Sequence, residues 1–294
     1  ILKKLEWIGG LNTDFMGIIS SKKSVFKDNK KNFFYVWTYI IENLPKIDLI
    51  FLEKNPIKFE NQYNFFIQNF KIKKSIINLT IILDSTWINK EFVNKRIIND
   101  NKRQRKRLSK FGNLKFFIAD SKKDKLEIVN KMIQQKHLHY NQGGKSMFSL
   151  RKYKDLYLLC SDNLGKYGKV HISALLINDE IIATHWGFYN NETFYYIMPS
   201  YNINKWGVYS PGKILLEFLI DWSSNNNIKK FDFTEGDATY KRNWSNNIDY
   251  LYEITIVKSV KGFLLYSFYK MKFFLKKIYF IVFFYKFLKK LFRI

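Results

Sequence analysis

The stretch that decides the fold begins Ile181-Ile-Ala-Thr-His185-Trp-Gly-Phe188 and continues to Trp244. Its first eight residues alternate as a β-strand does, which places Ala183, His185 and Gly187 on one face. Small neighbours on both sides of a histidine are expected where a ligand approaches a sheet. His185 is therefore a candidate general base, because a neutral imidazole accepts a proton near pH 7. The alternative is a histidine packed in the core.

A helix is predicted to begin at the tripeptide Ser210-Pro211-Gly212. Serine is a favoured N-cap, proline fits the first helical position, and glycine allows close approach to the backbone. The free amides at such a helix start suit an anion, and a pyrophosphate is the natural guest. A capped helix without any ligand explains the same three residues.

The segment Asp232-Phe-Thr-Glu235-Gly-Asp237-Ala-Thr-Tyr240-Lys241 is expected to contain a strand end, a turn and a short helix. A helix that begins at Asp237 places Tyr240, Lys241 and Trp244 on the same face as Asp237. A tyrosine there could protonate a departing thiolate, and the lysine could bind a phosphate or a carboxylate. The structural alternative is an aspartate N-cap with the two aromatic rings packed inward.

The order of the predicted elements indicates an α/β (α+β) fold with a mixed central sheet flanked by helices. Asn178-Asp179 and Asn190-Asn191 supply the turns of a three-stranded meander. In chain order, the expected elements are strand 115–120, helices 124–140 and 150–161, strands 169–177, 180–188 and 192–199, helix 211–224, strand 229–234, short helix 237–243 and strand 250–258.

The composition excludes a disordered chain and suggests an anionic partner. Of 294 residues, 47% are hydrophobic and 18% aromatic, which is enough to fill a sizeable core. Codon bias explains part of the lysine content, but a formal net charge of +25 still points to nucleic acid, anionic lipid or an anionic ligand. The single cysteine, Cys160, excludes an internal disulfide and indicates a reducing compartment. With four histidines we expect no metal site.

The first half of the chain is expected to form an α/β unit of its own. Residues 47–52 and 77–83 are strand candidates, and residues 34–41 suit a short helix or a strand. A basic helix is predicted over residues 90–110, and its cations include Arg105. That helix presents either a solvated face or a phosphate-binding surface. We expect domains at residues 1–110 and 111–258, followed by a tail at 259–294.

The tail is basic and amphipathic. No acidic residue follows Glu253, and the longest uncharged run between Lys270 and Arg293 is residues 278–285. Because a membrane span needs about 20 apolar residues, this tail is not expected to cross a bilayer. It suits a helix that lies on an anionic membrane surface. A helix packed on its own domain is the alternative.

Four motifs in this order resemble one enzyme family. The segments are Ala183-Thr-His185-Trp-Gly187, Pro199-Ser-Tyr201, Ser210-Pro211-Gly212 and Asp232-x-x-x-Gly236-Asp237-x-x-Tyr240-Lys241. With the element order, they look like the GNAT-superfamily acetyltransferases first associated with bacterial cellulose biosynthesis. That family is similar to the Fem-type aminoacyltransferases, which carry two GNAT-like units in tandem. The first half fits more loosely, through Gly10-x-x-x-Asp14-Phe and the basic helix.

The resemblance implies a GNAT-type acyltransferase with acetyl-CoA or another acyl-CoA as the donor. It places the pyrophosphate and pantetheine of the donor near Met198, Pro199, Ser210, Pro211, Gly212 and Lys213. It assigns His185 as the base and Tyr240 as the acid. Asp237 is expected to be a third catalytic residue. Asp232, Glu235, Lys241 and Arg105 are then expected to bind substrate. The long Gln/Arg-x-x-Gly-x-Gly/Ala loop of ordinary GNAT enzymes is absent.

Three functions are consistent with these features. The first is acyl transfer to an amine or hydroxyl of a sugar, lipid or cell-envelope or polysaccharide precursor. That enzyme would be cytoplasmic, with residues 259–294 holding it at the inner face of the membrane. The second is Fem-type transfer from an aminoacyl-tRNA, the one case in which we expect a nucleic-acid partner. The third is a nucleic-acid-binding protein, which only the charge supports.

Overall fold

The computed structural model describes residues 1–9, 13–18, 30–59, 62–88, 91–140, 146–163, 169–272 and 274–275. The chain forms two compact units, one of residues 1–76 and 250–294 and the other of residues 77–249. These bounds differ from the expected division after residues 110 and 258. Residues 77–110 fold with the second unit, because Leu79, Trp87 and Leu108 are buried in its core.

The first unit has a small sheet and an aromatic core. In the sheet, β2 (Leu49–Asn55) pairs parallel with β1 (Lys4–Leu5) and antiparallel with the C-terminal part of β11 (Asn247–Val257). The strand expected over 47–52 is thereby confirmed, and residues 34–41 are helical. The other elements of the unit are α1 (Lys30–Glu42), α2 (Phe65–Asn69) and a separate ribbon of β3 (Lys58–Phe59) and β4 (Gln62–Tyr63). Phe33 contacts Phe66 edge-on, with their ring centroids 5.2 Å apart, in the core between these elements.

Residues 260–272 form a helix in the first unit. Before it, the Ser259 hydroxyl donates to Asp48 Oδ1 at 2.5 Å. A Cβ on Gly262 would overlap the Asp48 carbonyl, so only glycine allows this contact. The expected basic tail otherwise lies outside the described residues, at 273 and 276–294. No helix among the residues described is long and apolar enough to cross a membrane.

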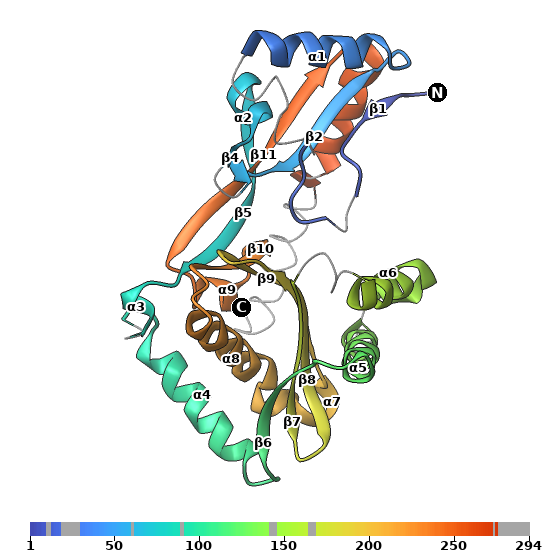
Figure 1. The fold of residues 1–294 in the computed structure, drawn as a ribbon. Coiled ribbons are helices and arrows are strands. Elements are labelled where there is room, and N and C mark those ends of the chain that lie inside the picture. Colours follow the sequence, from blue (N-terminus) through green and yellow to red (C-terminus); the bar gives the residue numbers. More distant parts are fainter. Residues whose placement is uncertain are drawn as a thin grey trace, which may run out of the picture. The chain divides into compact units, whose positions relative to one another are not determined.

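The second unit contains the three-stranded meander and every helix expected between residues 90 and 243. The predictions for these elements are confirmed, with bounds that shift by a few residues (Figure 1). Its elements are the part of β5 (Ile72–Ile82) from residue 77 on, α3 (Ser85–Ile88), α4 (Lys95–Leu108), β6 (Leu114–Ile118), α5 (Lys122–Tyr140), α6 (Arg151–Asn163), β7 (Lys169–Ile177), β8 (Glu180–Tyr189), β9 (Thr193–Tyr201), α7 (Ile203–Trp206), α8 (Pro211–Asn225), β10 (Lys230–Glu235), α9 (Thr239–Arg242) and the first residues of β11.

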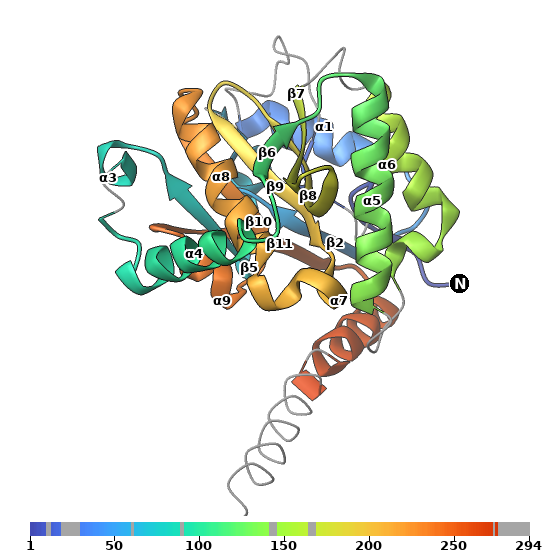
Figure 2. The same cartoon turned by 90° about the horizontal axis from the view of Figure 1, so that it is seen from below.

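The sheet of this unit is mixed and is covered on both faces. Its strands lie in the order β5-β10-β9-β8-β7-β6. The β9–β10 pair is parallel, whereas β5–β10, β8–β9, β7–β8 and β6–β7 are antiparallel. Helix α8 lies on one face, and α5 and α6 lie on the other (Figure 2). The fold is thus the expected mixed sheet flanked by helices.

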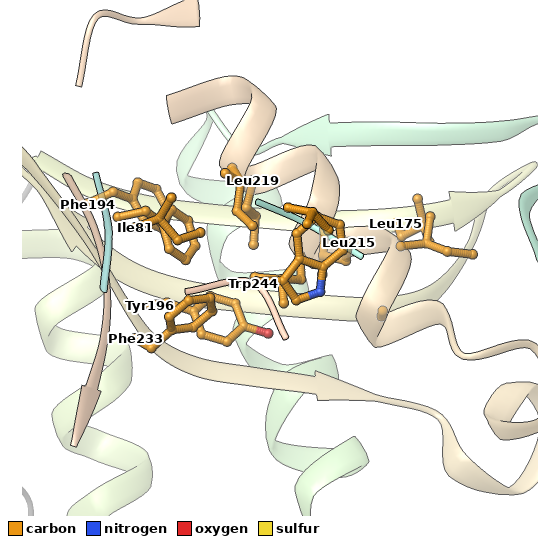
Figure 3. Close-up of a cluster of buried hydrophobic side chains, with 14 of the residues drawn as sticks. Ile81, Leu175, Phe194, Tyr196, Leu215, Leu219, Phe233 and Trp244 are labelled. Atoms are coloured by element: carbon orange, nitrogen blue, oxygen red, sulfur yellow. The ribbon is translucent and has the colours of Figure 1, made fainter. Parts of the chain in front are cut away.

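Two hydrophobic clusters hold these layers together. On the α8 side, Leu215 and Leu219 pack with Phe194, Phe233 and Trp244 (Figure 3). On the α5 side, Val129 and Met132 pack with Trp186, whose indole N–H donates to Ser161 Oγ on α6 at 2.8 Å. Residues that alternate along β8 therefore supply both cores, and neither face of that strand is left open to solvent.

The turns of the meander form where the sequence places asparagine. Asn178 takes a φ of 52°, a left-handed conformation that asparagine tolerates well, and closes the β7–β8 hairpin. The Asn190 side chain accepts hydrogen bonds from the amides of Glu192 and Thr193 before β9 begins. These contacts confirm both predicted turns and set the register of β8 and β9.

Candidate functional site

Strands β9 and β10 pair over only three residues and then part. Their parallel register runs from Thr193–Lys230 to Tyr195–Asp232 and stops there. Strand β9 continues to Tyr201, paired on its other edge with β8. A cavity of about 380 Å³ lies beside this remaining part of β9, between α5, the start of α8 and Tyr240. The parting of two parallel strands thus leaves room for a ligand at the sheet.

Strand β10 has a bulge at the point where it separates from β9. The register of β10 against β5 shifts between Asp232 and Glu235, and Thr234 has a φ of 58°, a costly conformation for a β-branched residue. The buried Asp232 carboxylate accepts the Thr234 amide at 2.8 Å. Lys241 donates its amine to the carbonyls of Phe233 at 2.8 Å and Glu235 at 2.6 Å. Asp232 and Lys241, expected to bind substrate, therefore hold the backbone of this bulge.

The effect of burial on the pKa of Asp232 is opposed by the groups that contact its carboxylate. Desolvation raises the pKa of this carboxyl, and the charge of Lys230, the Thr234 amide and the Asn78 side chain oppose that rise. Lys230 Nζ lies 3.3 Å from the carboxylate, and Asn78 Nδ2 donates to it at 3.3 Å. The contacts place Asp232 in the framework of β10 and β5. It does not line the cavity.

Four of the residues predicted to bind the donor line this cavity. They are Pro199, Ser210, Gly212 and Lys213. The other two do not: Pro211 is buried in the first turn of α8, and Met198 packs with the cluster on the α5 side of the sheet. The same cavity is lined further by Lys136, His139, Thr184, Tyr196, Ser200, Tyr201, Gly207, Leu215, Leu216 and Tyr240.

The start of α8 differs in detail from the predicted cap. Ser210 has a φ of 52°, and its side chain makes no cap hydrogen bond, whereas a usual serine N-cap is extended. Its carbonyl accepts the amides of Lys213 at 3.0 Å and Ile214 at 3.4 Å. A Cβ on Gly212 would lie 3.1 Å from the Tyr201 ring, so glycine allows that ring to approach the helix start. The helix nevertheless begins at Pro211, as predicted.

His185 lies in the core and not at the cavity. The side chain is 0% exposed, and its ring stacks on Tyr196 with centroids 5.0 Å apart and an interplanar angle of 6°. The expectation of an open face is wrong, because Gly187 serves packing. A Cβ there would lie 2.3 Å from the Tyr195 carbonyl oxygen and 2.7 Å from the His185 ring. The alternation of residues along β8 predicts on which face of the sheet His185 lies. It does not show that α8 covers that face.

A second buried histidine lies beside the first. His171 on β7 packs against Trp222 of α8, with centroids 4.4 Å apart, and its ring lies 5.8 Å from that of His185. No nitrogen of either ring has a hydrogen-bond partner among the described residues. Burial lowers the pKa of His171 to about 3. Burial, with His171 as a smaller cause, holds the pKa of His185 well below its ordinary value. Both rings are therefore neutral in the native protein.

Tyr240, which the resemblance assigns as the acid, lines the cavity at β9. Burial raises the pKa of its phenol. Tyr196 lines the cavity as well, and burial raises the pKa of that phenol further. Each phenol thus keeps its proton at neutral pH and can donate it to an oxygen or a sulfur in the cavity.

The remaining predicted residues make structural contacts. Asp237 accepts from Arg242 Nη2 at 2.6 Å, and this hydrogen bond lowers the pKa of its carboxyl. Arg105 Nη2 lies 2.9 Å from Glu217 Oε2, and the guanidinium lies over the Phe218 ring, 4.4 Å from its centroid. Arg105 therefore joins α4 to α8 and does not line the cavity at β9. The predicted substrate residue Glu235 also lies outside that cavity, and its carbonyl accepts a hydrogen bond from Lys241.

A larger cavity of about 710 Å³ adjoins the first and is more polar. Lys213 and Tyr240 line both cavities. Helix α4 contributes Arg96, Asp100 and Arg103 to the larger one. Arg103 Nη2 donates to Asp100 Oδ1 at 2.6 Å, and Lys213 Nζ lies 3.9 Å from Asp100 Oδ2. Three cations and one carboxylate thus line this cavity, and the excess of positive charge suits an anion.

Lys136 and His139 are two of the residues of the smaller cavity that sequence reasoning missed. They lie three apart on α5, so they share a helix face. His139 Nε2 lies 3.0 Å from the Tyr201 carbonyl oxygen. Burial lowers the pKa of Lys136 to about 8. Helical spacing could have paired the two residues, but nothing in the sequence places α5 against the end of β9.

The described part of the chain contains no cluster of side chains that could serve as metal ligands. No three His, Cys, Asp or Glu side chains gather there in a way that could hold a metal ion. The polar groups that line the two cavities are cations, phenols, hydroxyls, amides, one imidazole and the Asp100 carboxylate. Such groups bind an anion, hold a carbonyl and transfer protons.

Comparison with known proteins adds a family and two similar folds. The model of the family described as the acetyltransferase (GNAT) domain matches residues 95–242. No curated protein matches the chain. The C-terminal domain of a putative lysylphosphatidylglycerol synthetase from Agrobacterium fabrum matches with a TM-score of 0.57 at 10% identity, over 81% of this chain and 78% of that one. FemX matches with a TM-score of 0.57 at 9% identity, and the match covers 83% of this chain and 79% of FemX. At these identities the likeness is one of fold.

The buried histidines make the protein sensitive to acid. The unfolded chain binds protons at the ordinary histidine pKa of about 6.5, whereas the native state keeps both rings neutral far below it. As the pH falls below that value, the unfolded state holds more protons. The free energy of unfolding should then drop by about 1.4 kcal/mol per pH unit for each ring, and for His171 this continues to about pH 3.

Urea unfolding between pH 7 and pH 5 measures this slope. His171→Phe removes one titrating ring and should make the slope shallower, whereas His137→Phe, on α5 outside both cavities, should leave the His171 and His185 contribution intact. An equal slope in the His171→Phe variant and the parent protein would contradict the account.

Proposed function

The chain belongs to the GNAT acetyltransferase domain family and is an acyltransferase, and we propose that it transfers an acyl group from acyl-CoA to an amine or a hydroxyl. The observation that carries the proposal is the parting of β9 and β10, with a cavity beside the start of α8. A thioester that enters there would reach Tyr240. The motifs around Ala183, Pro199, Ser210 and Asp232 further support a relative of the acetyltransferases associated with cellulose biosynthesis.

The donor would occupy both cavities. Its acyl group and pantetheine would lie in the smaller cavity, along Pro199 and Tyr201 of β9. Its phosphates would lie in the larger one, near Arg96, Arg103 and Lys213, because charge-assisted hydrogen bonds favour phosphate there. Lys213 lines both spaces and would sit where the two parts of the donor meet. This arrangement gives a role to α4, which lies ahead of the meander in the chain.

Tyr240 would act on the leaving group. When the acceptor attacks the thioester carbonyl, the carbon–sulfur bond breaks and a thiolate departs. A phenol whose proton is retained at neutral pH can give that proton to sulfur, so that a thiol leaves. Tyr240 lines the smaller cavity, in which the acyl group, the sulfur and the pantetheine would lie, so its phenol would share that space with the departing sulfur.

A membrane-surface acceptor is the finer part of the proposal. In the helix 260–272, Val260, Phe263, Leu264 and Phe268 are exposed, while Tyr269 stacks over Phe51, with ring centroids 6.2 Å apart. One side of this helix therefore packs on the first unit and the other side offers apolar groups. With the lysines of residues 276–294, this suits the surface of an anionic bilayer. Such an enzyme would act on an envelope or polysaccharide precursor at the cytoplasmic face.

Fem-type transfer from an aminoacyl-tRNA is the second candidate. The fold likeness to FemX and the cationic cavity under α4 favour it. The 3′ end of a charged tRNA carries phosphates next to an acyl ester, so it presents the same chemistry to the two cavities. Thermal shift across acetyl-CoA, longer acyl-CoAs and aminoacyl-tRNAs separates these donors. Stabilisation by aminoacyl-tRNA but by no acyl-CoA would favour this second candidate.

Charge reversal tests the donor site. Lys213→Glu should raise the Kd for acetyl-CoA at least about tenfold, because one charge-assisted hydrogen bond contributes about 1.5–3 kcal/mol. Arg96→Glu should weaken binding as well. Arg96 lines only the larger cavity, so this change should affect only the contacts to the donor's phosphates. Lys229→Glu makes the same change of charge outside both cavities and serves as the control. Isothermal titration calorimetry measures all four proteins, and equal Kd values would refute the proposed site.

Removal of residues 276–294 tests the membrane proposal. This truncation keeps Lys270, whose Nζ lies 2.8 Å from Glu253 Oε1 in the first unit. Cosedimentation with vesicles that contain phosphatidylglycerol should fall strongly, while vesicles of phosphatidylcholine alone should bind the full chain weakly. Unchanged cosedimentation of the truncated chain with the anionic vesicles would end the proposal.

A further inference from the structure

We propose that His139 is the general base of the transfer reaction. This inference rests on the proposed function and deepens it by naming the group that takes the proton of the acceptor. His139 lies on α5 and lines the cavity at β9 together with Tyr240 of α9. The base and the acid would thus approach the thioester from different elements of the second unit.

The hydrogen bond of His139 fixes which nitrogen is basic. Its Nε2 lies 3.0 Å from the carbonyl oxygen of Tyr201. A carbonyl oxygen only accepts hydrogen bonds, so Nε2 carries the proton and Nδ1 of the neutral ring keeps its lone pair. The Tyr201 ring meets the imidazole edge-on, with centroids 4.5 Å apart and an interplanar angle of 81°. The last residue of β9 therefore orients the base in the way that a carboxylate orients the histidine of a catalytic triad.

The charges around His139 keep it neutral. Burial lowers the pKa of this ring, the hydrogen bond to Tyr201 opposes that change, and the nearby charge of Lys136 lowers the pKa further. The other titratable groups that line the cavity are Lys213, Tyr196, Tyr201 and Tyr240. No carboxylate lies among the described residues that line it, so nothing there stabilises an imidazolium before the acceptor binds. A histidine in this setting is ready to accept a proton at neutral pH.

The step balances with these two residues alone. The amine or hydroxyl of the acceptor attacks the thioester carbon, and a carbon–nitrogen or carbon–oxygen bond forms. The acceptor loses its proton to Nδ1 of His139. The carbon–sulfur bond breaks, and the sulfur takes the phenolic proton of Tyr240. Proton exchange with solvent then returns His139 to its neutral form and Tyr240 to its phenol, so acyl thioester and acceptor become acylated acceptor and free thiol.

Lys136 is placed to assist this base. Its amine lines the same cavity one helical turn before His139. A cation there disfavours a proton on His139 in the free enzyme and attracts the oxygen that becomes negative during attack on the carbonyl. Lys136 would thus act through charge, whereas His139 would move the proton.

The tautomer can be measured without any donor. In a ¹⁵N-labelled sample, long-range ¹H–¹⁵N spectra should show His139 with a protonated Nε2 and an unprotonated Nδ1 at pH 7. The signal is assigned by its loss in His139→Gln, and His137→Gln serves as the matched control on the same helix. A ring protonated on Nδ1, or on both nitrogens at pH 7, would overturn the proposal.

Turnover gives the second readout. Release of thiol from acetyl-CoA is followed with hydroxylamine as the acceptor. His139→Gln keeps an N–H that can donate to Tyr201 but has no basic nitrogen. Its kcat should fall about 10²-fold or more while KM for acetyl-CoA stays near that of the parent. His137→Gln should retain the kcat of the parent. A kcat in His139→Gln equal to that of the parent, or a change in KM alone, would overturn the assignment.

The two failures are distinguishable. If neither acetyl-CoA nor a longer acyl-CoA stabilises the parent protein in thermal shift, the proposed function fails, and the assignment of His139 as its base fails with it. If the donor binds the parent and His139→Gln equally and both release thiol at one rate, the proposed function stands and the base lies elsewhere. Far-ultraviolet circular dichroism confirms that the variant is folded.

Discussion

The second unit depends on where strands β9 and β10 cease to pair. Parallel strands share backbone hydrogen bonds as long as both remain extended, and β10 stops doing so at Asp232. Thr234 then takes a left-handed conformation that costs about 1–3 kcal/mol. The Asp232 carboxylate, which binds the Thr234 amide, and Lys241, which binds two carbonyls of the bulge, stabilise that conformation. Side chains expected to bind substrate thus maintain the opening beside which a substrate could bind.

The opening brings together groups from elements that are distant in sequence. Helix α5 contributes Lys136 and His139, β9 contributes Tyr201, the start of α8 contributes Ser210 and Lys213, and α9 supplies Tyr240. Helix α4 extends the same space with cations in the larger cavity. In the proposed function, the larger cavity would hold the phosphates of the donor and the smaller cavity its thioester. Both cavities are lined mainly by residues of the segment that matches the GNAT acetyltransferase domain family.

Local sequence signals predicted much of this unit, and the errors share one cause. The meander, its asparagine turns and the start of α8 at Pro211 depend on neighbouring residues, so they could be predicted. The environment of His185 depends on α8, and that of His139 on the end of β9; both contacts join segments that sequence periodicity cannot pair. The sequence therefore offers His185 as a candidate base although it is buried, and no motif in the sequence singles out His139. Which side chains lie together at a site therefore became clear only from the three-dimensional structure.

Hydrogen exchange with and without acetyl-CoA tests the central claim most directly. The account predicts slower exchange of backbone amides in residues 196–201, at the start of α8 and in residues 239–244, where the two cavities lie. Residues 30–42 of the first unit, which line neither cavity, should exchange at the same rate in both states. Protection confined to the first unit, or no protection at saturating acetyl-CoA, would contradict the donor site at the parting of β9 and β10.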